Sequence, residues 1–291
     1  MTQTTRASNK IVMDDKQNNL WESFWQSKTS FYKEHLYQVT TQWELYEYIK
    51  FQYLAGIFSP QQRTPSLECG CGSAGVSLHL ASRGYQTTML DKAGSALQLA
   101  QYSFDYYGQK GFFVRGDVLS LPFPDNCFEA VMSFGLLEHF VDVRPVLGEM
   151  VRVLKPGGVL FADIVPGRFS VQTLADLFFN IPLVALYAIF TFKWKKGWGW
   201  IRQRLSPEFF ENRFSRQEYH AFLKEAGLEG TVIKGNNPFP RLILPQFLER
   251  VFVGILKRFL ALWQRFDRSD TWFSNNFWCR GWWAYGQKPK H

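Results

Sequence analysis

The sequence predicts an α/β domain built on a mostly parallel sheet. Between residues 64 and 165, short apolar runs alternate with longer helical patterns. A glycine turn, Gly70-Cys71-Gly72, follows the first apolar run, and an aspartate follows each of the next two. Strands that alternate with helices form parallel sheets through right-handed crossovers. A ligand is therefore expected at the carboxyl ends of the strands, near the switch between the first and the fourth.

The N-terminal part precedes this alternation. Residues 1–18 are polar and mixed in charge, and we expect a disordered tail there. From Trp21 to Phe58, aromatic side chains recur mostly at helical spacing, which predicts helices packed over the edge of the domain. Two prolines separate this helical arm, residues 19–60, from the domain proper, residues 61–291.

The alternating region predicts most of the sheet. Strands are expected at Leu67–Cys69, Gln86–Leu90, Phe112–Val114, Phe128–Ser133 and Gly158–Ile164, with helices at Ala74–Arg83, Ala93–Tyr106 and Val143–Leu154. Further along the chain, a helix is expected at Arg216–Ala226, a strand at Gly230–Ile233 and a last strand at Phe277–Gly286.

Two apolar segments interrupt the pattern after the fifth strand. Leu177–Phe192 is nearly all apolar and is followed by a run rich in Trp and Lys, while Arg241–Phe266 mixes apolar with basic residues. We expect hydrophobic helical cap insertions over about 170–215 and 238–270. Leu177–Phe192 is close to the lower length of a bilayer-spanning helix, but an asparagine and a proline interrupt it. A buried cap, an interfacial membrane contact and a true span are the alternatives.

Composition adds weaker information. The net charge of +8 suits an anionic partner, either nucleic acid or a membrane surface, although such an excess is also ordinary surface chemistry. The aromatic content of 18% suits a bulky apolar ligand or an aromatic-rich core. Four cysteines form no C-x-x-C pair, so we expect neither zinc nor a redox dithiol. Met1–Leu20 contains no apolar leader, and we expect a cytoplasmic protein, alternatively one that is peripheral on the membrane.

A carboxylate ahead of the glycine turn selects among ligands. Gly70, Gly72 and Gly75 fit the dinucleotide spacing G-x-G-x-x-G, so this spacing alone is ambiguous. Glu68 stands two residues before the first glycine, where it would repel a pyrophosphate and favour a positively charged ligand. S-adenosylmethionine (SAM), with its ammonium and sulfonium centres, is such a ligand. We therefore predict SAM as the cofactor.

Further motifs follow in order. They are Leu67–Gly72, Leu90-Asp91, Gly116–Phe128, Leu137-Glu138-His139 and Val151–Gly158. With these motifs at these separations, the chain resembles the class I SAM-dependent methyltransferases over about residues 64–165. The resemblance is to the type 11-like group, whose members methylate small molecules and lipids. It implies a Rossmann-like seven-stranded sheet whose last strand is antiparallel.

The resemblance implies a role for each matched residue. Gly70 and Gly72 would let the backbone approach the methionine part of SAM. Asp91, about 20 residues beyond the turn, would accept both ribose hydroxyls. Asp117 would accept from the adenine amino group, and the Val118 N–H would serve a ring nitrogen. Taken alone, either aspartate could equally be a helix cap or a turn residue.

Three residues complete the implied ligand set. Glu68 stands where aspartate is commonest in the family. Phe134, just past the fourth strand, would line the methionine side. Lys92 stands where an apolar residue is more usual, and it either crosses over the adenine or faces solvent. We expect no metal site.

His139 is the best-placed candidate for catalysis. Methyl transfer from a sulfonium is an in-line displacement, so the protein mainly aligns donor and acceptor in a dry pocket. An oxygen acceptor usually needs a base, and histidine is suited to this role near neutral pH. The alternative role of His139 is structural. Trp25, Phe31 and Tyr32 are candidates for a lid over the ligand.

These features predict an enzyme that methylates an O or N atom of a bulky hydrophobic molecule such as a natural product, quinone or lipid. Two alternatives remain, a non-catalytic SAM-binding accessory protein at the membrane and a nucleic-acid methyltransferase. Enzymes that methylate base amines often carry N-P-P-aromatic after the fourth strand, whereas this chain has Ser133-Phe134-Gly135. Asn237-Pro238-Phe239 is similar but comes too late in the fold. We expect a hydrophobic small-molecule substrate, a membrane-surface contact and no nucleic-acid partner.

Overall fold

The computed structural model describes residues 15–26, 33, 35–57, 64–165, 167–192, 194–205, 209–236, 239–267 and 269–290. Most of the expected tail lies outside these ranges, as do the lid candidates Phe31 and Tyr32. Helix α1 (Asp15–Gln26) begins inside the segment expected to be tail. The rest of the described N-terminal arm contains a short 3-10 turn, η1 (Leu36–Gln38), and helix α2 (Gln42–Ile57).

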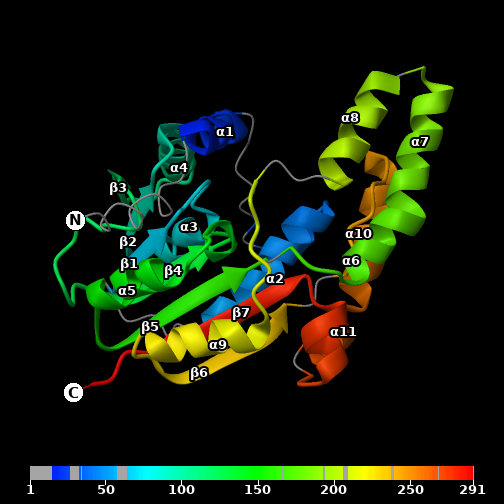
Figure 1. Cartoon of the computed structure of the whole chain (residues 1–291). Helices are drawn as coiled ribbons and strands as arrows, with labels where there is room; N and C mark the ends of the chain where they lie inside the picture. Colours follow the sequence, from blue (N-terminus) through cyan, green and yellow to red (C-terminus); the bar gives the residue numbers. More distant parts are fainter. Residues whose placement is uncertain are drawn as a thin grey trace, which may run out of the picture.

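A seven-stranded sheet forms the centre of the domain, in the order β3-β2-β1-β4-β5-β7-β6 (Figure 1). Its strands are β1 (Pro65–Cys69), β2 (Gln86–Asp91), β3 (Phe112–Arg115), β4 (Phe128–Phe134), β5 (Leu154–Ile164), β6 (Glu229–Asn236) and β7 (Gly281–Gln287). The first five strands are parallel, and β7 is antiparallel to both β5 and β6. This confirms the sheet that the resemblance implies. Because β1 lies between β2 and β4, the strand order reverses there, at a typical ligand position.

Helices connect the strands. They are α3 (Gly75–Ala81), α4 (Gly94–Tyr106), the 3-10 turn η2 (Leu137–His139), α5 (Arg144–Val153) and α9 (Arg216–Glu225). The starts of β5 and β7 differ most from expectation. β5 begins at Leu154 because this residue already pairs with Phe128, ahead of a bulge in the register. β7 begins at Gly281 because Phe273–Trp278 forms a π-helical turn, η4.

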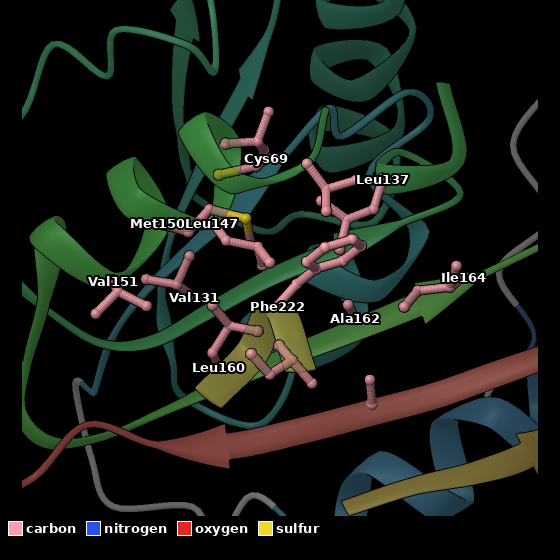
Figure 2. Packing of buried hydrophobic residues seen from close by; sticks show 14 of the residues in the cluster. Cys69, Val131, Leu137, Leu147, Met150, Val151, Leu160, Ala162, Ile164 and Phe222 are labelled. Carbon is pink, nitrogen blue, oxygen red and sulfur yellow. The ribbon is translucent and has the colours of Figure 1, made fainter. Parts of the chain in front are cut away.

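Alternation of side chains along the strands divides the core between the two faces of the sheet. On one face, α5 and α9 place Met150 and Phe222 against Val131 of β4 (Figure 2). On the other face, α2, α3 and α4 pack against the alternate strand residues, including Met132 and Phe161. Neighbouring residues of β4 therefore belong to opposite clusters, as expected for a strand buried on both sides.

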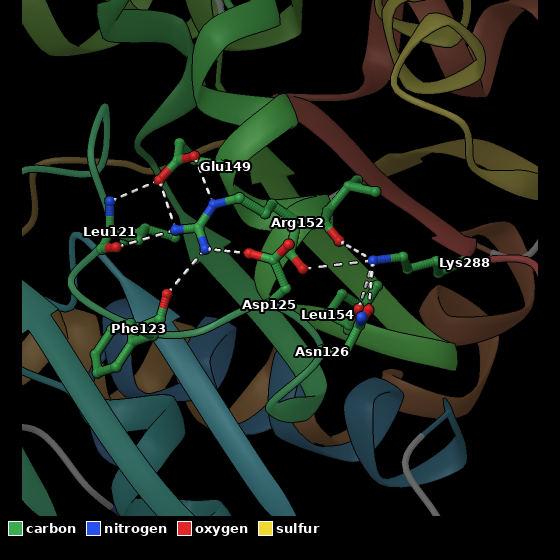
Figure 3. Close-up of polar contacts among 9 residues, drawn as sticks. Leu121, Phe123, Asp125, Asn126, Glu149, Arg152, Leu154 and Lys288 are labelled. Carbon is green, nitrogen blue, oxygen red and sulfur yellow. Dashed lines mark hydrogen bonds and ion pairs between the residues drawn. The ribbon is translucent and has the colours of Figure 1, made fainter.

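Two basic side chains fix the end of β4 that lies away from the expected ligand edge (Figure 3). The Arg152 guanidinium donates at 2.7 Å to Glu149 and to Asp125, and it also reaches two carbonyl oxygens of the preceding loop. Lys288 Nζ donates at 2.8 Å to Asn126 Oδ1 and to two backbone carbonyls around the end of α5. The carboxyl end of β4 is thus built on an anchored strand.

The helical insertion after β5 is present and is largely exposed. Val171–Phe190 is one continuous helix made of α6 (Val171–Ala175), the π-helical turn η3 (Asp176–Asn180) and α7 (Ile181–Phe190). Helix α8 (Trp194–Leu205) packs against α7, and the pair projects from the sheet beside α10 (Gln246–Arg258) (Figure 1). Among the described residues, Val171–Phe190 is the one helix long and apolar enough to cross a membrane. Because most of it is exposed, the structure does not show the buried cap.

Candidate active site

Two cavities meet at the carboxyl ends of the central strands. The first, of about 310 Å³, lies over β1, β2 and β4, and the second, of about 330 Å³, lies between the glycine turn and α2. All nine predicted site residues line one or both cavities: Glu68, Gly70, Gly72, Asp91, Lys92, Asp117, Val118, Phe134 and His139. The structure therefore brings together side chains that are spread over about seventy residues of sequence.

The glycine turn needs its glycines for two reasons. Gly70 and Gly72 have φ values of +63° and +51°, in the left-handed region that side chains with a Cβ rarely adopt. A Cβ at Gly70 would also lie 2.7 Å from Leu136 Cδ1, and one at Gly72 would collide with the Trp25 indole. The turn thus offers bare backbone to whatever occupies the two cavities.

Asp91 is held at the base of the first cavity by backbone amides. Its Oδ2 accepts from Gly72 N–H at 2.9 Å, and its Oδ1 accepts from Ala93 N–H at 2.9 Å. Burial raises the pKa of the carboxyl, and the backbone bonds oppose that rise. The carboxylate orientation is therefore fixed before any ligand arrives.

Asp117 and Lys92 pair at the same cavity. Lys92 Nζ donates to Asp117 Oδ2 at 3.1 Å, while Asp117 Oδ1 accepts from Leu119 N–H at 3.0 Å. The Lys92 ammonium lies in the wall of the first cavity, next to Asp117. Both side chains remain about two-fifths exposed, so this pair is open to a ligand.

Glu68 lies at the floor of the second cavity and is almost fully buried. Its Oε2 accepts from Ser77 N–H at 3.0 Å, at the first turn of α3. Burial is the main cause that raises its pKa to about 7, and the bonds to Ser77 only partly oppose it. A cationic ligand beside Glu68 would stabilise its ionised form.

His139 borders both cavities. Its Nδ1 lies 2.7 Å from the Phe210 carbonyl oxygen. A carbonyl only accepts, so Nδ1 carries the hydrogen and Nε2 keeps its lone pair. Burial lowers the pKa of the ring, which is therefore neutral at pH 7. The ring packs edge-on to Trp21, with 5.0 Å between centroids.

Helix α1 supplies site residues that the sequence patterns did not reveal. Glu22 Oε1 accepts from Gly94 N–H at 2.7 Å and Glu22 Oε2 accepts from Ser95 N–H at 2.9 Å, so it caps α4 from a distance. The local cap position of α4 is Ala93, whose side chain cannot accept a hydrogen bond. The missing side-chain cap at Ala93 is the feature of the sequence that predicts a capping group from another part of the chain. Trp25, expected in a lid, borders both cavities.

Helix α2 supplies buried polar groups that were also missed. The Tyr46 hydroxyl donates to Asp163 Oδ2 at 3.2 Å and accepts from Asn236 Nδ2 at 2.6 Å. Lys50 Nζ donates to Glu47 Oε1 at 2.8 Å, and both residues are buried. The aromatic spacing of this segment is typical of a helix that packs through apolar side chains, so the pattern did not predict the buried polar residues of α2.

Comparisons with known proteins agree with this geometry. A family model described as a methyltransferase domain matches residues 67–162. A demethylmenaquinone methyltransferase of Bacillus licheniformis is 31% identical over 170 residues, which cover 56% of this chain and 70% of that protein. A norajmaline N-methyltransferase of Rauvolfia serpentina is 32% identical over 108 residues, covering 35% of this chain and 37% of the relative.

Solved structures share the fold over most of the chain. The [4+2]-cyclase SpnF has a TM-score of 0.60 at 18% identity, covering 98% of this chain and 100% of that chain. The phosphoethanolamine N-methyltransferase 2 of Haemonchus contortus, in complex with SAM, has a TM-score of 0.52 at 16% identity, covering 95% and 57%. At this identity the likeness concerns the fold alone. What the protein catalyses depends on the side chains at the two cavities, which a shared fold does not determine.

Proposed function

The chain belongs to the class I SAM-dependent methyltransferases, and from that premise we propose that its two cavities hold SAM beside a hydrophobic small-molecule acceptor. The enzyme uses SAM as its methyl donor. The observation that carries the assignment of the site is the set of three carboxylates, Glu68, Asp91 and Asp117, around one bare glycine turn. Carboxylates suit hydroxyl, amino and cationic groups and disfavour phosphate.

We propose the following division of roles. Asp91 and Asp117 of the first cavity hold the ribose and adenine of SAM, and Lys92 and the Val118 N–H complete that end. Gly70, Gly72, Glu68 and Phe134 receive the methionine part. SAM supplies an electrophilic methyl group on a sulfonium centre. The residues around it orient that group and exclude water, which is the main work in an in-line displacement.

His139 is the proposed proton acceptor for a hydroxyl substrate. Its neutral ring, fixed by the Phe210 carbonyl, leaves Nε2 free to accept a hydrogen bond at the border of the two cavities. The proton of the hydroxyl would pass to Nε2 as a C–O bond forms and the C–S bond of SAM breaks, with the electron pair of that bond going to sulfur. Asparagine in place of His139 keeps the hydrogen bond to Phe210 but cannot take this proton.

The proposed acceptor is hydrophobic, of the quinone, lipid or natural-product kind. Relatives support this class by name: a demethylmenaquinone methyltransferase and a phthiotriol/phenolphthiotriol dimycocerosates methyltransferase 1 of Mycobacterium ulcerans, 33% identical over 114 residues. The latter match covers 38% of this chain and 41% of that protein.

We also propose that the insertion rests on an anionic membrane surface. Its large apolar side chains face outward along α7, including Leu183, Leu186 and Phe190. Basic residues such as Lys195 and Arg202 lie on α8, as expected at a headgroup interface. A span is disfavoured because the charged α8 packs closely on α7 and would be carried into the hydrocarbon.

Titration calorimetry with SAM tests the cofactor site. Asp91→Asn removes one charged acceptor while keeping the side-chain shape, and we expect SAM affinity to fall roughly 10- to 100-fold. Asp105→Asn, on the exposed face of α4, is the matched control and should bind as the parent does. Equal SAM affinity of the parent and the Asp91 variant would contradict the proposed SAM site.

A further inference from the structure

The described lining of the second cavity contains more acidic than basic side chains. The described carboxylates that line it are Glu47, Glu68, Glu138, Asp163 and Glu211, against the cations Lys50 and Arg280. Bound SAM carries one net positive charge, from two cationic centres and one carboxylate. Among the described lining residues the carboxyl groups outnumber the cations, which favours a cationic ligand over an anionic one. A buried excess of this kind is costly unless a further cation enters or the carboxyl groups stay protonated.

The walls of the same cavity are aromatic. They include Phe24, Trp25, Trp43, Tyr46, Phe51 and Phe134. Faces of such rings attract cations, and the attraction grows when water is excluded. Lys50 already shows this preference, because its Nζ lies 5.4 Å from the centre of the Tyr46 ring. Aromatic walls and surplus carboxylates together recognise ammonium groups better than neutral hydroxyls.

Within this cavity, Glu138 is the residue whose surroundings point most directly to a bound ligand. It is 2% exposed, and its Oε1 accepts from Val165 N–H at 3.2 Å. Its Oε2 is buried and has no hydrogen-bond partner in the described part of the chain. Burial and the neighbouring Asp163 and Glu211 raise the pKa of Glu138 to about 8. A buried carboxyl oxygen without a partner is a strong candidate for a ligand contact.

We propose that the second cavity is the methyl-acceptor site and that its preferred acceptor is a hydrophobic primary or secondary amine, held as an ammonium ion by Glu138 and the aromatic walls. This inference rests on the proposed function and names the acceptor atom within it. It also suits the acidic lining of the cavity, because a nearby ammonium ion stabilises the ionised form of Glu138.

The chemistry balances with groups already at the site. The ionised Glu138 takes one proton from the bound ammonium, which frees the nitrogen lone pair. The nitrogen then attacks the methyl carbon of SAM. An N–C bond forms as the C–S bond breaks, and its electron pair goes to sulfur, giving S-adenosylhomocysteine and a methylated ammonium. Glu138 suits an amine better than His139 does, because burial raises its pKa and lowers that of His139.

Paired probes with the same apolar body test this inference. 4-Phenylbutylamine and 4-phenylbutanol differ only in the acceptor group, and tryptophan fluorescence titration with S-adenosylhomocysteine present reports their binding. We expect the amine to bind at least roughly tenfold more tightly than the alcohol. Glu138→Gln should abolish this preference, because it keeps an oxygen for Val165 N–H but removes the charge. Equal binding of both probes would overturn the inference.

Further measurements separate a folding defect from a binding defect. Glu129→Gln, on β4 and paired with Lys155 at 3.3 Å, is the matched control and should keep the amine preference. Glu211→Gln weakens the same charge surplus from another element and should reduce the preference partly. SAM titrations on each variant distinguish the two proposals. Lost SAM binding by the parent chain would defeat the proposed function, whereas intact SAM binding with an alcohol preference would defeat only the amine assignment.

Discussion

At the scale of single residues, the pKa values of two carboxyl groups at the cavities, those of Glu22 and Glu68, are shifted in opposite directions. Hydrogen bonds from Ser95 lower the pKa of Glu22, which lies near the surface. Burial outweighs similar bonds at Glu68 and raises its pKa to about 7. The difference follows from the depth of each group, because desolvation grows with burial while each backbone bond contributes a similar amount.

Glu68→Gln should therefore remove one contribution to the pH dependence of stability. Burial raises the pKa of Glu68 to about 7 in the folded chain, whereas in the unfolded chain the group loses its proton near its ordinary pKa of 4.5. The folded state binds more protons between these values, so the free energy of unfolding falls as pH rises through them. The expected contribution of Glu68 to this fall is about 3 kcal/mol.

Urea denaturation at about pH 5 and about pH 8 measures this effect. The stability of the parent relative to that of the variant should fall between these two pH values, since glutamine does not titrate. The buried His79, whose pKa is lowered to about 4, contributes a slope of the opposite sign in both proteins. Glu138 keeps part of the slope in both proteins, because its pKa is also raised. A variant slope equal to that of the parent would show that Glu68 titrates normally.

Sequence patterns predicted those cavity-lining residues that follow strands, and they missed the residues that reach the cavities through the packing of distant helices. Gly70, Asp91 and Asp117 follow apolar runs at family spacing, so local signals were sufficient. Glu22 and Tyr46 act on partners more than 70 residues away, Ser95 and Asp163. No local period encodes such contacts, because they depend on how α1 and α2 pack on the sheet.

At the scale of elements, α1 joins the first cavity to the helix beside it. Glu22 provides the cap that α4 lacks, while Trp25 lies on Gly72 and borders both cavities. A SAM molecule that extends across the glycine turn must share this space with Trp25. Helix α1 is therefore suited to act as the lid, and its grip on α4 sets how firmly the lid is held.

Glu22→Ala should loosen this lid. The variant leaves the first N–H groups of α4 without their acceptor, which typically costs about 1 kcal/mol for a lost cap. We expect faster hydrogen exchange at the Gly94 and Ser95 amides and along α1, with the core of the sheet unchanged. Ser23→Ala, on the exposed face of α1, is the control and should exchange as the parent does. Unchanged exchange at Gly94 would contradict the capping role.

Element boundaries show the same division between local and distant causes. Strands β2 and β3 were expected almost as observed, because apolar runs and a following aspartate bound them. The start of β7 was placed too early, at Phe277, since Phe277 and Trp278 favour a strand by propensity but belong to the π-helical turn Phe273–Trp278. Asn275 explains the override: its Oδ1 accepts from Gly235 N–H at 2.7 Å, tying the turn to β6.

At the scale of the whole molecule, the active site and the exposed apolar surface are separate. None of the described residues of α7, α8 or α10 lines either cavity at the glycine turn. Asn180 Nδ2 donates to the Arg241 carbonyl, and Asn180 Oδ1 accepts from the Ile243 N–H. These bonds hold the start of α7 beside the segment that leads into α10. Two insertions distant in sequence thus form one surface, a relation that composition alone could not predict.

Charged substitutions on this surface should reduce membrane binding without reducing SAM binding. Phe178 and Phe190 are 65% and 79% exposed, and inserting each phenyl ring into a bilayer is worth about 1.5–3 kcal/mol. We expect Phe178→Glu with Phe190→Glu to lower co-sedimentation with phosphatidylcholine vesicles containing phosphatidylglycerol by at least roughly tenfold. Tyr102→Glu with Tyr106→Glu, on exposed α4, is the matched control. Because basic residues flank the apolar face, added salt or omission of phosphatidylglycerol should also weaken binding by the parent. A parent protein that stays in the supernatant with these vesicles would show that the surface serves another purpose.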